Sequence, residues 1–175
     1  LRQDPDIISV GEIRDGETAG IAMRSAITGH LVMSTLHTND AVSAVYRLRD
    51  IGVEPWLIAS ALRGVISQRL VRKICPHCKT AYQPSEEELA LLGMPEDSQT
   101  TFYKGVGCPE CRHTGYVGRR AAFEILMVNR EVRRLLAAAK KNGYRTMRDS
   151  CRDLVLRGIT TAEEAARTIN STLDE

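Results

Sequence analysis

Two cysteine pairs constrain the middle of this chain more than any other feature. Each pair has the form C-x2-C, as "CPHC" at Cys75 and Cys78 and as "CPEC" at Cys108 and Cys111, and 29 residues separate the pairs. A two-residue spacer lets both thiolates of a pair face one tetrahedral ion, and the proline inside each pair helps the tight turn. Four sulfurs complete the coordination sphere, so the spacing predicts a structural Zn²⁺ rather than a catalytic one.

Disulfides, unligated thiols, iron and an iron–sulfur centre are alternative interpretations of the same four cysteines. Disulfides are the weaker explanation because the first residues lack the basic-then-apolar order of a signal peptide. His77 and His113 lie beside the pairs, and we expect both to be solvated loop residues because four sulfurs suffice. The fifth cysteine, Cys151, is expected in a core. Metal binding should supply much of the local folding free energy, about 10 kcal/mol.

The first seventy residues alternate strand and helix patterns. Asp15 is placed to cap a helix, and Pro55 suits a first helical turn. The strand–helix–strand–helix order predicts an α/β fold with a parallel sheet, whose first strand is buried. We expect strands over residues 7–10 and 30–38, and helices over residues 16–29, 39–52 and 54–71.

The rest of the chain changes from loops to helices. Ser85 with Glu88, and Thr161 with Glu164, have the spacing of capping boxes. These patterns predict three segments, namely residues 1–72, 73–117 and 118–175. We expect a short helix in 84–93, a loop and hairpin in 100–118, a strand over 119–128, and helices over 129–143, 146–158 and 160–173.

Polar side chains follow the two predicted strands of the first segment. Glu12 and Asp15 come just after the first strand, and His37 comes near the end of the second. Ligands of parallel α/β sheets bind beyond the carboxyl ends of the strands, where nucleotide hydrolases place a carboxylate near Mg²⁺. If the strands are neighbours, Glu12 and His37 share one rim. A solvated loop with a structural histidine has the same composition and stays an alternative.

Composition weighs against two classes of partner. No apolar run approaches the length of a membrane span, about 18 residues. Basic residues near the cysteines raise the hypothesis of a nucleic-acid-binding zinc ribbon, but aromatic residues make up only 5% of the chain and the net charge is only +2, so we expect no nucleic-acid partner. The basic residues concerned are Arg69, Arg72, Lys73, Lys79, Arg112, Arg119 and Arg120.

Three segments resemble motifs of the ATPases that drive type II secretion and type IV pilus assembly. "DPDIISVGEIRDGETA" resembles the Walker B region of that family, and "TGHLVMSTLHTNDA" resembles its histidine box. "RLVRKICPHC…CPECRHTGYVGR" resembles the tetracysteine zinc segment of the assembly subgroup. The order and spacing of the three agree with the family, and the resemblance covers essentially the whole chain.

The resemblance implies an α/β fold: the C-terminal part of a RecA-like P-loop ATPase core, a zinc segment and a small helical C-terminal subdomain. It implies that Glu12 is the Walker B glutamate that polarises the attacking water. It places His37 near the γ-phosphate and makes Arg14 and Asp15 supports of the Glu12 loop. ATP and Mg²⁺ are then the ligands of the full-length protein, and Zn²⁺ is structural, held by the four cysteines.

The resemblance also implies an assembly. Members form homo-hexameric rings at the cytoplasmic face of the inner membrane, as peripheral proteins. They pass motion to an inner-membrane platform protein, which extrudes pilin or pseudopilin subunits, and they bind a cytoplasmic-domain adaptor of the machine. The alternative is that the chain is a non-catalytic zinc-bearing adaptor module that binds a partner in such a machine.

The 175 residues contain no Walker A loop of the form G-x4-G-K-[ST]. Without that lysine and its nest of backbone N–H groups, ATP loses most of its anchoring. We therefore expect a C-terminal fragment, starting at Walker B, that neither binds ATP tightly nor hydrolyses it. The first strand would then expose an apolar edge, and we expect it to be disordered, repacked or paired with another chain.

Overall fold

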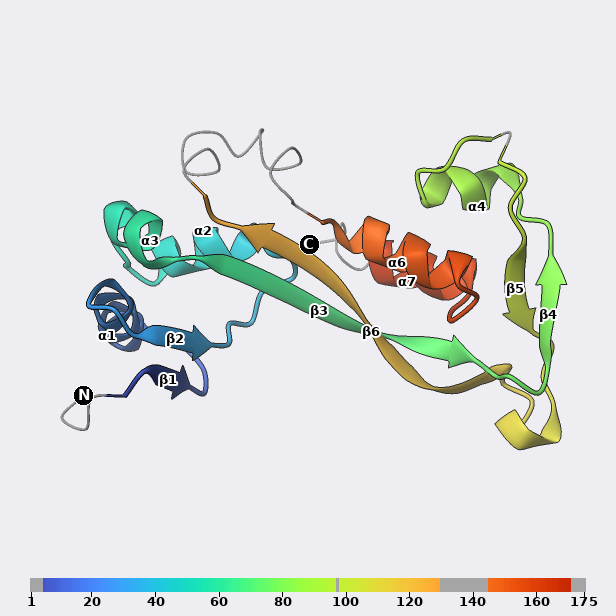
Figure 1. Cartoon of the computed structure of the whole chain (residues 1–175), viewed down its shortest axis with the longest axis horizontal. Coiled ribbons are helices and arrows are strands. Elements are labelled where there is room, and N and C mark those ends of the chain that lie inside the picture. The colour runs from blue at the N-terminus through green and yellow to red at the C-terminus, as the bar shows by residue number, and fades with distance from the viewer. Residues whose placement is uncertain (1–4, 97, 130–144, 171–175) are drawn as a thin grey trace. The chain divides into compact units, whose positions relative to one another are not determined.

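A computed structural model of the chain describes residues 5–96, 98–129 and 145–170. The chain divides into two compact units (Figure 1). Unit 1 contains Leu1–Ser67 and Ile125–Tyr144, and unit 2 contains Gln68–Glu124 and Arg145–Glu175. The helix expected over 129–143 lies almost wholly outside the described residues. None of the described helices is long and apolar enough to cross a membrane.

Unit 1 begins with a parallel strand pair. Strand β1 (Ile7–Val10) lies beside β2 (Leu31–Ser34), and helix α1 (Gly16–Ile27) connects them. The cap predicted for this helix is present, because the Asp15 carboxylate accepts a 2.8 Å hydrogen bond from the backbone N–H of Thr18. The first predicted strand and the helix after it are therefore confirmed. The strand predicted over residues 30–38 is shorter than expected and ends at Ser34, so His37 lies beyond it.

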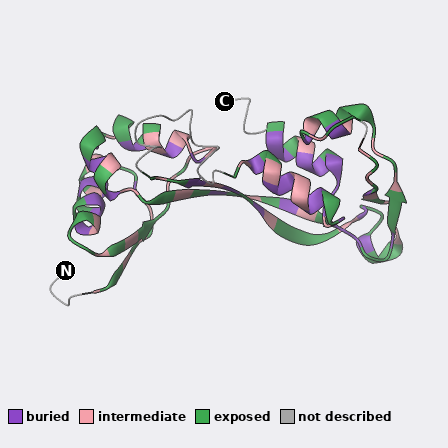
Figure 2. Cartoon of the chain, turned by 45° about the horizontal axis from the view of Figure 1, so that its top comes forward, coloured by how far each residue is buried: buried purple, intermediate pink, exposed green. Residues whose placement is uncertain are grey.

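Two further described helices belong to unit 1. Helix α2 is Ser43–Asp50 and helix α3 is Pro55–Ala61, with Pro55 in its first turn as predicted. Helix α3 packs against α1, and α2 packs against α3. Together these elements bury one apolar cluster, which is the core of unit 1 (Figure 2). Its buried members are Ile13, Ala19, Ala22, Met23, Leu48, Val53, Leu57, Ile58 and Ala61.

The helix predicted over residues 54–71 is wrong in its second half. Helix α3 ends at Ala61, and strand β3 (Gly64–Ile74) follows. Gly64 disfavours a continuing helix, and the burial of β3 alternates: Ser67 and Val71 are buried, while Ile66 is 65% exposed. The apolar residues seemed to cover every side of a helix because they belong to two different elements.

The prediction that the first strand is buried is also wrong. Ile7 is 57% exposed in β1, and Leu31 and Met33 are 54% and 52% exposed in β2. The exposed apolar edge was expected, but β1 pairs in regular register with β2 of the same chain. The expectation that it would be disordered therefore does not describe this structure, whereas pairing of β1 with another chain stays a prediction. Backbone pairing and packing of Val10 against the unit 1 core hold the strand.

Two strand pairs follow in the chain. Strand β3 pairs with β6 (Tyr116–Met127), and the two run in opposite directions (Figure 1). The division between the units falls within both of these strands. Strand β4 (Lys79–Tyr82) pairs antiparallel with β5 (Phe102–Gly105). The strand expected over 119–128 is thus confirmed and begins slightly earlier than predicted.

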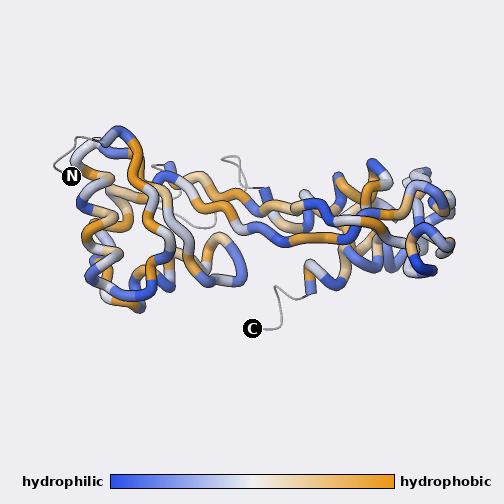
Figure 3. The backbone as a smooth tube through the Cα atoms, turned by 90° about the horizontal axis from the view of Figure 1, so that it is seen from below, coloured by the Kyte–Doolittle hydropathy of each residue, from blue (hydrophilic) through white to orange (hydrophobic). Residues whose placement is uncertain are grey.

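Unit 2 also contains helices α4 (Glu86–Leu91), α6 (Met147–Leu156) and α7 (Ala162–Asn170), and the 3₁₀ turn η1 (Pro109–Cys111). Apolar segments from these elements and from the strands (orange in Figure 3) supply a second core. Its buried members are Val71, Leu89, Leu92, Phe102, Ala122, Met147, Cys151, Leu154, Val155, Ala162, Ala165 and Ile169.

Local capping signals are confirmed at α4 and only half confirmed at α7. Ser85 and Glu88 form the reciprocal capping box that their spacing predicts. At α7 the Thr161 hydroxyl accepts from the N–H of Glu164 at 3.0 Å, but the Glu164 carboxylate turns to Arg72 instead. Residues from the second and third predicted segments both contribute to unit 2. The α/β class is confirmed, whereas the RecA-like core, the helical subdomain and the three-segment division stay predictions.

Candidate functional sites

The ends of β1 and β2 bring together the side chains predicted to share a rim. The register pairs Val10 with Ser34, so both strands finish at the same edge. Beyond them, Nε2 of His37 lies 3.1 Å from Oε1 of Glu12. Arg14 donates from Nε to the other carboxylate oxygen of Glu12 at 2.7 Å, and a second guanidinium nitrogen lies at the same distance. We call Glu12, Arg14 and His37 the rim cluster.

Thr35 fixes the backbone on both sides of Glu12. Its hydroxyl donates a 2.7 Å hydrogen bond to the carbonyl of Gly11, and its carbonyl accepts a 3.0 Å bond from the N–H of Ile13. Ile13 is buried in the unit 1 core, which anchors the loop. Sequence reasoning did not single out Thr35. Its place directly after β2 is the signal that could have found it.

The rim cluster is accessible and holds an ionised carboxylate. The side chains of Glu12, Arg14 and His37 are 22%, 77% and 89% exposed. The hydrogen bond from Arg14 lowers the pKa of Glu12; partial burial opposes the shift, and the charges of Arg14 and His37 add to it. An ionised, hydrogen-bonded carboxylate beside an imidazole can orient and polarise a water molecule.

The carboxylate of Asp15 bonds to Thr18 and not to the residues of the rim cluster. It accepts from the backbone N–H and from the hydroxyl of Thr18, and these bonds lower the pKa of Asp15. The printed contacts of the Asp15 side chain are therefore those of a helix cap at the start of α1.

The four predicted metal ligands meet in unit 2. Their sulfur atoms all lie within 4.8 Å of one another, and none of the four forms a disulfide. The Sγ atoms of Cys75 and Cys108 are 3.9 Å apart, as are those of Cys78 and Cys111, and those of Cys108 and Cys111 are 3.7 Å apart. A tetrahedral ion with Zn–S bonds of about 2.3 Å sets its sulfurs about 3.8 Å apart. The cluster therefore fits one Zn²⁺.

Hydrogen bonds from the backbone favour the thiolate form of Cys111, which is the form that binds metals. The N–H groups of Cys108 and Gly115 each point to this Sγ at 3.2 Å. Burial raises the pKa of the Cys111 thiol, but these two N–H groups, together with the neighbouring thiols of Cys108 and Cys78, outweigh burial and lower the pKa to about 6. Gly115 has a φ of +77°, and a Cβ there would overlap the backbone of Gly105. A glycine is therefore needed at this turn.

The two histidines beside the cysteine pairs and the fifth cysteine lie in the environments that the sequence predicts, loop and core. His77 and His113 are exposed and do not belong to the ligand group found among the described residues. Cys151 is fully buried in the unit 2 core, where its thiol has a pKa raised by burial to about 11. Both the loop histidines and the core cysteine are thus confirmed.

Comparison with known proteins establishes the family. The model of the type II/IV secretion system protein family matches residues 1–168. Because the match covers nearly the whole sequence, the chain belongs to this family. The resemblance noted in the three sequence motifs is therefore confirmed.

Individual relatives agree with this assignment. The chain is 51% identical to the type IV pilus assembly ATPase PilB of Thermus thermophilus, with 97% of this chain and 20% of the relative covered. It is 48% identical to the type II secretion system ATPase E of Vibrio cholerae, with 95% and 35% covered. The chain thus spans about a fifth to a third of the length of these relatives.

A solved structure supports the fold alone. The ATPase DotB of Legionella pneumophila superposes with a TM-score of 0.65 at 22% sequence identity, covering 97% of this chain and 40% of that protein.

Proposed function

We propose that this chain is the C-terminal, RecA-like portion of an ATPase that powers secretion or pilus assembly, and that the rim cluster belongs to its hydrolytic centre. The observation that carries the proposal is the 3.1 Å contact between Glu12 and His37 at the ends of neighbouring parallel strands. Ligands of parallel sheets bind at this end. The relatives named as ATPases support the same activity.

In this proposal, Glu12 is the catalytic carboxylate. As an ionised acceptor it polarises the attacking water, while His37 sits near the γ-phosphate. Arg14 holds one carboxylate oxygen of Glu12 in place, and Asp15 supports the loop by beginning α1. Mg²⁺ bound together with the nucleotide would supply positive charge against the charge that develops on the phosphates. The 175 residues contain no Walker A loop, so we expect that they neither bind ATP tightly nor hydrolyse it alone.

The cysteine cluster has a structural role in the same proposal. Cys75, Cys78, Cys108 and Cys111 hold Zn²⁺ in a closed sphere that leaves no position for a substrate. The ion supplies folding free energy to the turns that carry the four cysteines.

The proposed assembly is a homo-hexamer, peripheral at the cytoplasmic face of the inner membrane. Hydrolysis moves subunits of the ring, and the motion reaches an inner-membrane platform protein that extrudes pilin or pseudopilin subunits. A cytoplasmic-domain adaptor of the machine binds the ring. The names of the relatives, one from a pilus and one from a type II secretion system, support a partner of this kind.

A second candidate is a non-catalytic zinc-bearing adaptor that binds a component of such a machine. The observation in its favour is that the four cysteines of the metal cluster all lie among the described residues, whereas a phosphate-binding loop is missing from these 175 residues. The hydrolysis test that follows separates the two candidates.

Hydrolysis should be measured in a protein of the relatives' length that contains this chain, with Mg²⁺ and ATP. Glu12→Gln should lower kcat by about a hundredfold or more, because the variant cannot polarise water as a carboxylate does. Glu17→Gln is the matched control, since Glu17 is an exposed acid in the first turn of α1. Full activity of Glu12→Gln, or an equal loss in Glu17→Gln, would refute the catalytic proposal.

A further inference from the structure

The strand that enters the cysteine cluster is hydrogen-bonded to the turn between α6 and α7. The N–H of Ile74, the residue directly before Cys75, donates to the carbonyl of Ile159 at 2.8 Å. Two residues earlier, the carbonyl of Arg72 accepts a 2.8 Å bond from the hydroxyl of Thr160. The end of β3 is therefore held by the metal cluster on one side and by the α6–α7 turn on the other.

The strand that leaves the cluster is joined to the same turn. The N–H of Gly115 donates to the sulfur of Cys111, and its carbonyl accepts from the N–H of Cys75 at 2.9 Å. The next residue, Tyr116, places its hydroxyl 2.8 Å from the hydroxyl of Thr161. Neighbouring residues of this strand therefore contact a proposed metal ligand, through Gly115, and the α6–α7 turn, through Tyr116.

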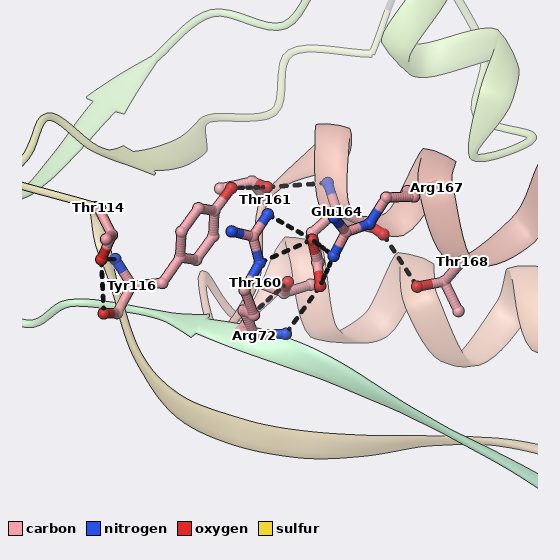
Figure 4. Close-up of polar contacts among 8 residues, drawn as sticks. All are labelled: Arg72, Thr114, Tyr116, Thr160, Thr161, Glu164, Arg167 and Thr168. Atoms are coloured by element: carbon pink, nitrogen blue, oxygen red, sulfur yellow. Dashed lines mark hydrogen bonds and ion pairs between the residues drawn. The ribbon is translucent and has the colours of Figure 1, made fainter.

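A buried carboxylate closes the connection (Figure 4). Glu164 of α7 is 2% exposed and accepts three hydrogen bonds from Arg72, of 3.1 Å from the backbone N–H and 3.0 and 2.8 Å from the guanidinium. The same guanidinium lies over the ring of Tyr116, 4.0 Å from its centroid. Arg167 donates to both carboxylate oxygens. We call Arg72, Tyr116, Thr161 and Glu164 the lock.

Electrostatics make the lock sensitive to small displacements. Burial raises the pKa of Glu164, but the hydrogen bonds from Arg72 and the charges of Arg72 and Arg167 lower it overall. A buried ion pair that loses one partner is strongly destabilised, because an uncompensated charge stays buried. Arg72 keeps its position only while β3 and β6 keep theirs, and both strands run directly into the metal cluster.

We propose that metal binding at the four cysteines and formation of the lock are energetically coupled, so that residues of the lock set the metal affinity although none is a ligand. Coupling between two sites is reciprocal. Metal binding must therefore order the α6–α7 turn to the same degree that an intact lock tightens metal binding. The inference rests on the proposed Zn²⁺ site and is independent of ATP hydrolysis.

The first test measures Zn²⁺ affinity by competition with a chromophoric chelator. Tyr116→Phe removes only the hydroxyl that contacts Thr161, and we expect it to weaken Zn²⁺ binding about fivefold. Tyr82→Phe is the matched control, since it removes one hydroxyl bond of 2.7 Å, to Glu88, within the same unit. Unchanged affinity in Tyr116→Phe, or an equal loss in both variants, would overturn the coupling.

The second test measures hydrogen exchange in the wild-type chain before and after a chelator removes the metal. The amides of Ile74 and Glu164, bonded to Ile159 and Thr161, should exchange about tenfold faster or more without metal. The amide of Ala19 in α1, which lies in unit 1 and donates to the carbonyl of Asp15, should change far less. Equal acceleration at all three amides, or none, would contradict the proposal. A chain that binds no Zn²⁺ would refute both the metal site and the coupling and leave the ATPase assignment untouched.

Discussion

The rim cluster and the cysteine cluster differ in how far their side chains are exposed to solvent. The rim residues are open to solvent, with His37 89% exposed, and two contacts to Glu12 hold them together. Of the cysteines, Cys75, Cys78 and Cys111 are at most 8% exposed, and two backbone N–H groups donate to the sulfur of Cys111. An exposed cluster can accept a substrate but adds little stability, whereas a closed one stabilises its unit but cannot take part in catalysis.

The largest loss of stability is expected when one proposed metal ligand of the cysteine cluster is removed. Cys78→Ser should abolish Zn²⁺ binding and unfold the region around the knuckles, because the site carries folding free energy of about 10 kcal/mol. Metal content and thermal unfolding measure the effect. Cys151→Ala is the control, since Cys151 lies in the unit 2 core away from the ligand group, and it should keep full metal content. A folded, metal-free Cys78→Ser chain would contradict the prediction.

The second-largest effect on stability is expected from a substitution in the lock. Glu164→Gln leaves the Arg72 guanidinium without its charge partner, and we expect the free energy of unfolding to fall by about 3 kcal/mol at pH 7. Glu163→Gln, an exposed neighbour, should change it by less than about 0.5 kcal/mol. Equal effects of the two substitutions in denaturant unfolding would show that burial of Glu164 does not matter.

Glu164 also predicts a pH dependence with a definite sign. Its pKa is lowered in the folded chain, so it stabilises the fold above the carboxyl pKa of the unfolded chain. That stabilisation is lost as the pH falls through the folded pKa. Wild type should therefore lose more stability than Glu164→Gln between neutral and acidic pH. Parallel curves for the two proteins would contradict this assignment.

At the rim cluster, the largest expected effect is on protonation rather than on stability. Arg14→Gln should raise the pKa of Glu12 toward that of an ordinary carboxyl group, because the Arg14 hydrogen bond is the main cause of the lowering. Carboxyl carbon shifts followed by NMR against pH measure the change. Arg47→Gln, on helix α2, should leave the titration of Glu12 unaltered; a shift there would show a general charge effect instead.

The smallest effect is expected at Thr35. Thr35→Val removes the hydroxyl bond to Gly11 and should lower the free energy of unfolding by less than about 1 kcal/mol, because the bond is solvent-exposed. It should nevertheless change the NMR signals of the His37 ring, since the Glu12 loop loses one of its two ties to Thr35. Thr35→Ser keeps the hydroxyl and should retain the wild-type signals. Identical spectra for Thr35→Val would show that the hydroxyl does not position the rim.

Predictions from sequence succeeded where the signal was local. Asp15 and Ser85 cap their helices through backbone groups three residues away, and the cysteine spacing specifies a turn of the chain around each pair. The prediction failed over residues 62–71, where a run of apolar residues fits a buried helix and a strand equally well. Pairing with β6, which comes about fifty residues later in the chain, decides the outcome there.

The sequence by itself determined which four cysteines come together, the starts of α1 and α4, and the family, because these depend on residue types at short, constant spacings. Only the tertiary structure decided that Glu164 leaves its capping box to bind Arg72, 92 residues away, and that Thr35 holds both sides of Glu12. A buried carboxylate takes the strongest partner that folding brings within reach. Sequence distance carries no information about that partner.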